Sequence, residues 1–389
     1  MKFQCGRQCR QSIRCAVGTL VVCLLAAPWA SSQSSMAGGN AKPQMSEEAF
    51  KNIQVLRGIP VNEFMGVMGF FSASLNMNCI DCHAKESAGN WDHYADDTPL
   101  KNTARRMVLM ENLINRADFG MERKVTCYTC HRGYQIPAVI PSLADQYGPP
   151  PAQDPDLVEV LPGTADTSAA AEKILDKYIQ AVGGTQNLAK VTSFTAKGTY
   201  NGFDTEFQKV ASEIYAKAPG MLTVTNHLSA GAATTTYNGS EAWIASVNEP
   251  VPMILLTGGD LDGARLDADL AFPGMLKQNL SKWHAGFPAV TIDNHPVQVV
   301  EATAAGGTQV KLFFDKDSGL LLRATRFVDT VVGHIPLHVD YSDYRAVSGV
   351  KMPFHWQETW VDGQSTTELT EIKANAPVAA DKFAKPASR

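Results

Sequence analysis

Two copies of the pattern Cys-x-x-Cys-His constrain this chain more than any other feature of its sequence. They are Cys79-Ile80-Asp81-Cys82-His83 and Cys127-Tyr128-Thr129-Cys130-His131. Two thiols at this spacing can bond to the two vinyl groups of one porphyrin, and the histidine that follows can ligate its iron. A redox dithiol or a zinc site also uses paired cysteines, but neither needs a histidine directly after the second one. The pattern therefore predicts two covalently bound haems c.

The predicted roles follow from the order of residues within each motif. The thioether bonds would come from Cys79, Cys82, Cys127 and Cys130, and one iron ligand of each haem from His83 and His131. We expect these six residues to form the redox centres of the protein.

Residues 1–30 have the pattern of a secretory signal peptide. Four basic residues and no acidic one precede an uncharged run from Cys15 to Ala30. This run is shorter than the roughly 20 apolar residues that a membrane-spanning helix needs, so a permanent anchor is the alternative. Lipid attachment at Cys23 is a second alternative, disfavoured because Val22 stands where lipoprotein signals have a small residue. We expect a periplasmic mature protein, with membrane association left open.

The counts of cysteine and of charge agree with export. Of the eight cysteines, four lie in the segment expected to be removed and four belong to the two motifs, so none is left for a structural disulfide. The formal net charge of −5 becomes more negative once the basic leader is lost, which argues against nucleic acid as a partner. A length of 389 residues is more than one small cytochrome needs and indicates two domains.

Residues 46–136 have a helical pattern. Ser46-Glu47-Glu48 is a helix N-terminal signature, a second helix is expected from about Asn62, and Thr98-Pro99 predicts a helix that runs to about Arg116. No stretch in this region alternates as a strand does. We therefore expect an all-α dihaem c-type cytochrome domain.

The rest of the chain has a different composition. Residues 137–165 are rich in proline and are expected to form a stiff, extended linker. Residues 166–384 begin with a helix expected at about 168–182 and continue as strands separated by turn pairs such as Asn238-Gly239 and Gly306-Gly307. This pattern predicts a mostly antiparallel β domain of the α+β kind, with the helix and residues 261–280 covering one face.

Methionines upstream of each motif can supply the second iron ligand, which raises the reduction potential of a haem. The candidates are Met65, Met68 and Met77 before the first motif, and Met107 and Met110 before the second. Met77 stands too close to Cys79 to reach the opposite face of the ring. A methionine at any of these positions can equally fill a gap in a core, and His93, in an aspartate-rich loop, is a competing ligand that would lower the potential.

Four segments of the helical region resemble one protein family. They are Asn52-Ile53-Gln54-Val55-Leu56, the Phe64 to Met68 spacing, Ala104-Arg105-Arg106-Met107, and the run from Val125 to Gly133. Together they resemble the first, two-haem half of the cytochrome c subunit of photosynthetic reaction centres, over about residues 47–150. The resemblance implies that Met68 pairs with His83 and Met107 with His131. The third and fourth haem motifs of that family, and the histidine that serves its fourth haem, are absent from this sequence.

The C-terminal half is similar, less closely, to the curved half-barrel of periplasmic lipoprotein carriers. The similarity lies in Phe314 to Leu320, in Tyr341 to Arg345, and in Val350-Lys351-Met352-Pro353. It implies a concave sheet face that can hold a hydrophobic small molecule such as an acyl chain or a quinone. A docking or spacer domain with a filled core is the alternative, and the scattered histidines of this half form no catalytic constellation.

The expected function is that of a periplasmic electron carrier and not of an enzyme. Two His/Met-ligated haems would pass single electrons from a soluble donor to a membrane-bound complex. The alternatives are a dihaem peroxidase-like enzyme, which needs an open or displaceable iron site, and a lipid or quinone carrier with an attached cytochrome domain. Acidic residues near the first motif and basic ones near the second predict haems of different potential.

Overall fold

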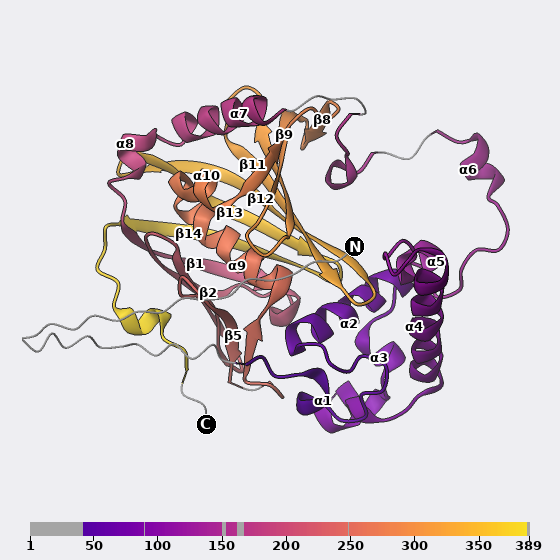
Figure 1. The fold of residues 1–389 in the computed structure, drawn as a ribbon. Coiled ribbons are helices and arrows are strands. Elements are labelled where there is room, and N and C mark those ends of the chain that lie inside the picture. Colours follow the sequence, from indigo (N-terminus) through magenta and orange to yellow (C-terminus); the bar gives the residue numbers. More distant parts are fainter. Residues whose placement is uncertain (1–41, 89, 150–152, 162–166, 248, 387–389) are drawn as a thin grey trace, which may run out of the picture. The chain divides into compact units, whose positions relative to one another are not determined.

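The helical elements come first in the chain. The computed structural model describes residues 42–386 except 89, 150–152, 162–166 and 248, so the predicted leader, with Val22 and Cys23, lies outside the described residues. The helices before residue 150 are α1 (Ser46–Ala49), α2 (Val61–Leu75), α3 (Cys79–Cys82), α4 (Pro99–Asp118), α5 (Cys127–His131) and α6 (Leu143–Tyr147), with 3-10 turns η1 (Lys85–Ala88) and η2 (Trp91–Ala95) (Figure 1).

The two long helices begin where the sequence predicts. Thr98 caps α4 by accepting a hydrogen bond from the Lys101 backbone N–H at 3.2 Å, and Pro99 occupies the first helical position. Helix α2 ends at Asn76, which has the left-handed conformation (φ 52°) typical of a helix C-terminus. The helix expected at Ser46 is a single turn. A helical first part is therefore confirmed, but long stretches between its helices are irregular, so it is less regular than the predicted all-α domain.

One large antiparallel sheet follows. Its 14 strands run in the order β6-β5-β4-β3-β2-β1-β14-β13-β12-β11-β10-β9-β7, and β8 pairs with β9. They are β1 (Ser193–Gly202), β2 (Val210–Lys217), β3 (Met221–Leu228), β4 (Gly231–Tyr237), β5 (Ala242–Ser246), β6 (Met253–Leu256), β7 (Ser281–His284), β8 (Val290–Ile292), β9 (His295–Thr303), β10 (Gln309–Asp315), β11 (Leu321–Thr330), β12 (Gly333–Val347), β13 (Val350–Trp360) and β14 (Gly363–Ala374). The predicted antiparallel sheet is confirmed, and the predicted turns at Asn238-Gly239 and Gly306-Gly307 join neighbouring strands.

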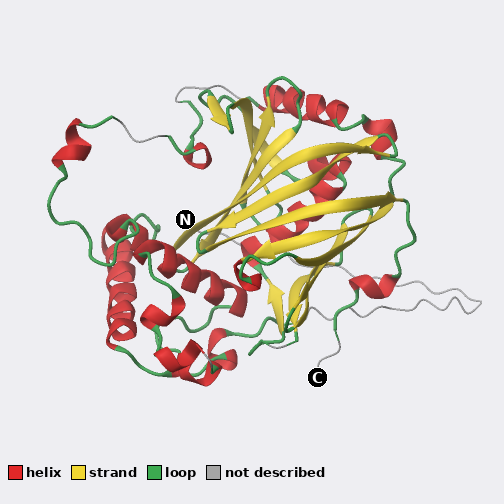
Figure 2. Ribbon diagram, turned by 180° about the vertical axis from the view of Figure 1, so that it is seen from behind, coloured by secondary structure: helices red, strands yellow, loops and turns green. Residues whose placement is uncertain are grey.

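The sheet is strongly curved, and helices cover part of it (Figure 2). Helix α7 (Ser168–Ala181) agrees with the helix predicted at about 168–182. Helices α9 (Gly258–Ala271) and α10 (Leu276–Asn279) lie in the segment 261–280, which was expected to cover one face of the sheet. Ala264 and Ala268 of α9 pack in an apolar cluster with β4 to β6, whereas Leu266 packs with β9 to β11. Helix α9 thus contacts both ends of the curved sheet.

Helix α2 packs against the turn between β11 and β12. Val67 and Phe70 of α2 share one apolar cluster with Val328, Val332 and Ile335. A Cβ atom added at Gly333 would lie 2.5 Å from the Phe70 ring, so glycine is the residue that permits this close approach. The helix that carries Met68 is therefore in direct contact with the sheet.

The end of the proline-rich segment is also held on the sheet. Lys311 of β10 is buried, with 2% exposure, and donates hydrogen bonds to the carbonyl oxygens of Asp156 at 3.1 Å and Val158 at 2.6 Å. The Asp156 carboxylate is hydrogen-bonded to Thr325 at 2.8 Å and to His338 at 2.6 Å. These contacts fix η3 (Pro155–Leu157) on β10 to β12.

Candidate functional site

The first Cys-x-x-Cys-His motif is a capped single helical turn. The Asn78 side chain accepts a hydrogen bond from the Asp81 N–H at 3.1 Å, and the Asp81 carboxylate accepts one from the Asn78 N–H at 2.9 Å. This reciprocal pair is a capping box, which stabilises the start of α3. Cys79 is exposed and Cys82 half-buried. Residues three apart lie on the same side of a helix, so the turn presents both thiols to one region of space.

The second motif is built in the same way. The Thr126 hydroxyl accepts a hydrogen bond from the Thr129 N–H at 3.3 Å, and the Thr129 hydroxyl accepts one from the Thr126 N–H at 3.0 Å. Helix α5 then ends at Arg132, which is left-handed (φ 51°). Cys127 is half-buried and Cys130 exposed. Both motifs thus consist of a polar cap, one turn with two thiols, and a histidine at or just after the end of the turn.

Both motif histidines are oriented by a backbone carbonyl. The Nδ1 of His83 lies 3.1 Å from the carbonyl oxygen of Tyr94, and the Nδ1 of His131 lies 3.0 Å from that of Tyr134. A carbonyl oxygen can only accept a hydrogen bond, so Nδ1 carries the proton and Nε2 keeps its lone pair. Burial and the nearby Lys101 lower the pKa of His83, which favours this neutral form. The arrangement is the one that an iron-ligating histidine requires.

The methionine candidates lie on the two long helices. Met68 on α2 and Met107 on α4 are half-buried, whereas Met65 and Met110 are more exposed, at 47% and 45%. Met68 packs against the same apolar cluster as Cys127. A hydrogen bond of 3.0 Å from the Gly133 N–H to the Ser74 carbonyl also joins α2 to the chain two residues after the second motif. The structure therefore brings α2 against the second motif, and the pairing of each methionine with a particular histidine stays a prediction.

His93, the competing ligand, interacts with an aspartate. Its Nδ1 lies 2.8 Å from the Asp96 carboxylate, and the pair lies at the surface. The hydrogen bond to Asp96 raises the pKa of His93, because it stabilises the protonated ring. The contact engages Nδ1 and leaves Nε2 free, as in the two motif histidines, so the choice between His93 and a methionine stays a prediction.

A buried glutamate beside the second motif was not predicted from the sequence. Glu111 of α4 is 4% exposed, and its Oε2 accepts a hydrogen bond from the Cys127 thiol at 3.2 Å. Its Oε1 is buried without a hydrogen-bond partner among the described residues. Burial raises the pKa of Glu111, and burial together with Glu111 raises that of the Cys127 thiol. The sequence held one signal for this residue: Glu111 is a single acid on the apolar side of α4, four residues after Met107.

The surroundings of both motifs fit a large planar apolar group. Several large apolar side chains in or next to the motifs in sequence remain exposed: Ile80 in the first, Tyr128 in the second, and Tyr134 and Ile136 shortly after the second. Clustered exposed apolar side chains are typical of a surface that a ligand or a partner covers. Together with the orphaned oxygen of Glu111, they fit haems c bonded to the four thiols.

The predicted contrast in charge between the two motifs is partly neutralised by ion pairs. Near the first motif, Asp92 pairs with Lys51 at 2.9 Å and Asp97 with Arg105 at 2.7 Å. Near the second, Lys124 pairs with Glu122 at 3.0 Å. If a haem is bound at each motif, a difference in their potentials would depend more on buried groups such as Glu111 than on surface charge.

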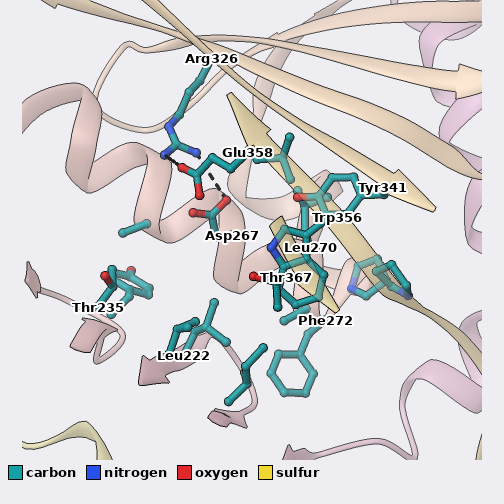
Figure 3. A pocket seen from close by; sticks show the side chains of 18 of the residues that line it. Leu222, Thr235, Asp267, Leu270, Phe272, Arg326, Tyr341, Trp356, Glu358 and Thr367 are labelled. Atoms are coloured by element: carbon teal, nitrogen blue, oxygen red, sulfur yellow. Dashed lines mark hydrogen bonds and ion pairs between the residues drawn. The ribbon is translucent and has the colours of Figure 1, made fainter. Parts of the chain in front are cut away.

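A second candidate site lies under the curved sheet. It is a cavity of about 1360 Å³, lined by strands of both halves of the sheet, by α9, and by residues of α2. Arg326 of β11 lies 3.4 Å from Asp267 of α9 and 3.8 Å from Glu358 of β13 (Figure 3). Burial raises the pKa of both carboxyl groups, against the opposing effect of the Arg326 charge. Sequence reasoning predicted a concave ligand-binding face but did not identify this charged cluster.

Fold and motifs together define a class of protein: a helical region with two Cys-x-x-Cys-His motifs, joined to a curved antiparallel sheet. Residues 26–179 match the family described as photosynthetic reaction centre cytochrome C subunit. The cytochrome c subunit of the Thermochromatium tepidum reaction centre is 36% identical over 110 residues, which cover 27% of this chain and 26% of that protein. The Roseobacter denitrificans subunit is 30% identical over 105 residues, covering 25% and 28%.

These comparisons confirm the predicted resemblance of the helical region to reaction centre cytochrome c subunits. The chain spans about a quarter of the length of these curated relatives. Among the described residues, no helix is long and apolar enough to cross a bilayer.

Among solved structures, a LolA superfamily protein from Nitrosomonas europaea is similar to this chain with a TM-score of 0.38 and 15% identity, over 55% of this chain and 97% of that one. A DUF1329 family protein from Desulfovibrio piger gives a TM-score of 0.39 and 10% identity, over 57% and 98%.

Proposed function

We propose that this protein is a dihaem c-type cytochrome that transfers single electrons. The observation that carries the proposal is the common construction of the two motifs, in which a capped turn holds two thiols and a carbonyl fixes the histidine with Nε2 free. The resemblance to reaction centre cytochrome c subunits supports the same role. When bound, each haem supplies a one-electron redox centre.

Each predicted residue has one role in this proposal. Cys79, Cys82, Cys127 and Cys130 hold the two haems c, His83 and His131 ligate iron on one side, and Met68 and Met107 ligate it on the other. Residues 46–136 form the cytochrome domain, 137–165 the linker, and 166–384 the β-rich domain. A methionine ligand on each iron blocks access of peroxide, which makes an electron carrier a better interpretation than a peroxidase-like enzyme.

The proposed location is the periplasm, after removal of residues 1–30. The leader pattern supports export, and the relatives are named as subunits of reaction centres. By analogy, the electrons would pass from a soluble donor to a membrane-bound complex.

Binding of a hydrophobic small molecule by the β-rich domain is a second proposed function. The observation that favours it is the cavity of about 1360 Å³ under the sheet, because most of its lining side chains are apolar. The cytochrome and the cavity would then belong to one protein with two binding activities.

An anaerobic reductive titration tests the electron-transfer proposal. The chain, matured in a periplasm competent for c-type haem attachment, is expected to take up two electrons, and the double variant Cys127→Ala/Cys130→Ala one. Rapid turnover of hydrogen peroxide, or uptake of a single electron by the unmodified chain, would contradict the carrier assignment.

A further inference from the structure

The cavity under the sheet is large and mainly apolar. Its volume of about 1360 Å³ exceeds the roughly 300–1,000 Å³ typical of pockets for drug-sized ligands. Leu222, Leu270 and Phe272 line it on one side (Figure 3). Burial of apolar surface drives the binding of apolar molecules, so the lining selects an occupant with a long apolar body.

The polar part of the cavity contains more acids than bases. Its acidic lining residues are Glu63, Asp176, Asp260, Asp267, Glu358 and Asp362, and its basic ones are Lys277, Arg326 and Lys351. At the charged cluster, one guanidinium lies between two carboxylates, at 3.4 Å from Asp267 and 3.8 Å from Glu358. Tyr341 and Trp356 line the same cavity (Figure 3).

This arrangement opposes a charged head group of either sign. A buried anion would be repelled by the carboxylates of Asp267 and Glu358 and would lose its hydration. A buried cation would be attracted by the same carboxylates, but both are already paired with Arg326, which would repel it, and it would also lose its hydration. A neutral hydroxyl or carbonyl oxygen avoids both costs. It can accept a hydrogen bond from the guanidinium, and a hydroxyl can also donate one to a carboxylate.

We propose that this cavity binds an elongated, uncharged amphiphile, with its hydroxyl or carbonyl head at Arg326, Asp267 and Glu358 and its apolar body along the sheet. The proposal rests on the small-molecule part of the proposed function and specifies its ligand class. It distinguishes this cavity from a site for fatty acids or anionic phospholipids.

One wall of the cavity belongs to the helix that carries Met68. Asn62, Glu63, Met65 and Gly66 of α2 line it. The Asn62 side chain is hydrogen-bonded to Asp260 of α9 at 2.8 Å, and Glu63 Oε1 accepts a hydrogen bond from the Val331 N–H at 2.9 Å. A molecule that fills the cavity as far as this wall would contact α2, and its binding would then be thermodynamically linked to the position of that helix.

Three ligands with one alkyl chain and different heads test the ligand class. Radiolabelled dodecanol, dodecanoate and dodecylamine are each dialysed to equilibrium at neutral pH, below their aggregation limits, against the full-length, haem-loaded protein. We expect dodecanol to bind at least about tenfold more tightly than either charged analogue, a difference of about 1.4 kcal/mol. Retention of dodecanoate or dodecylamine as well as or better than dodecanol overturns the inference but leaves small-molecule binding intact. If none of the three ligands is retained, both the ligand class and small-molecule binding by the β-rich domain are contradicted. The electron-transfer proposal is tested separately, by the reductive titration.

Variants of the charged cluster locate the head group. The double variant Asp267→Asn/Glu358→Gln removes two negative charges at nearly constant shape, so the preference for dodecanol over dodecanoate should shrink about tenfold. Glu368→Gln, at a carboxylate of β14 that pairs with Lys209 away from the cavity, is the matched control and should keep the preference. An equal preference in all three proteins would place the head elsewhere and overturn the assignment.

Hydrogen exchange tests the contact with α2. Saturating dodecanol should slow amide exchange in residues 61–75, measured by mass spectrometry on the haem-loaded protein, because the ligand covers part of that helix. Residues 99–118 of α4, which do not line the cavity, are the internal control. Slower exchange only in the strands would contradict the α2 contact.

Discussion

The side chain of Asn62 on α2 donates a hydrogen bond of 2.8 Å to the carboxylate of Asp260 on α9. The same amide accepts a hydrogen bond from the Thr257 hydroxyl at 2.9 Å and donates one to the Thr257 carbonyl at 3.2 Å. Asn62 is buried, with 8% exposure. The first turn of the helix that carries Met68 is thus tied to the start of the helix under the sheet.

Replacing this asparagine should destabilise the protein. In Asn62→Leu, Asp260 and the Thr257 groups lose a buried partner, which costs about 1–3 kcal/mol. Urea denaturation is expected to show a lower midpoint than for Asn112→Leu, at an exposed position of α4. Equal midpoints would mean that the α2–α9 contact contributes nothing to stability.

Gly333 should tolerate no side chain. In Gly333→Ala the new methyl group would lie 2.5 Å from the Phe70 ring, and the shift needed to relieve this contact costs about 1–3 kcal/mol. Gly274→Ala is the matched control, because a Cβ there has no neighbour within 4 Å. Thermal unfolding should show a clearly lower transition temperature for Gly333→Ala alone, and an unchanged temperature would contradict close packing of α2 on the β11–β12 turn.

The contact between Asp156 and His338 predicts a pH dependence of stability. Burial alone would raise the pKa of Asp156, but the hydrogen bond to His338 and the charge of Arg323 outweigh it and hold the pKa below its ordinary value of 3.8. A lowered pKa in the folded state means that the ionised carboxylate stabilises the fold above pH 3.8, and that this contribution is lost as the pH falls through the folded-state pKa.

The variant Asp156→Asn measures that contribution. Its free energy of unfolding should fall short of the unmodified protein's at neutral pH, and the two should converge as the pH is lowered below 3.8. Asp154→Asn, two residues earlier and exposed, is the control. A difference that stays constant or grows on acidification would show that the charge of Asp156 does not act in this way.

Glu111 should lower the reduction potential of the second haem alone. At alkaline pH its buried carboxylate stabilises the oxidised, more positive iron, so Glu111→Gln should raise the midpoint potential of the haem bound at Cys127 and Cys130. Glu122→Gln, at an exposed carboxylate paired with Lys124, should have little effect because solvent screens it. Spectroelectrochemistry resolves the two haems, and a shift in both or in neither would contradict the assignment.

Sequence reasoning succeeded where the signal is local. The start of α4 follows from Thr98-Pro99, and the hairpin turns follow from pairs such as Asn238-Gly239, because caps and turns depend on a few adjacent residues. The attachment motifs are likewise read from five consecutive residues. Secondary structure was therefore predictable before any tertiary contact was known, whereas haem attachment at the two motifs stays a prediction.

The rest depends on residues that are distant in the chain. Asp267, Arg326 and Glu358 come from a helix and two strands, and each is an unremarkable charge in its own segment. The pairing of β1 with β14 joins the strands β1 to β6 and the strands β7 to β14 into one sheet, and no short stretch of sequence predicts it. The binding of residues 155–158 by Lys311 was missed because proline content describes the backbone of a segment and not its packing.

Haem content and ligation test the central claim most directly. The full chain is matured in a periplasm competent for c-type haem attachment, its haem is quantified per chain, and its visible and near-infrared spectra are recorded. We expect two haems, both low-spin, with the sulfur-to-iron charge-transfer band of methionine ligation, which Met107→Ala reduces by half and Met110→Ala leaves intact. Fewer than two haems per chain, a high-spin iron, or the absence of that band would contradict the dihaem carrier with His/Met ligation.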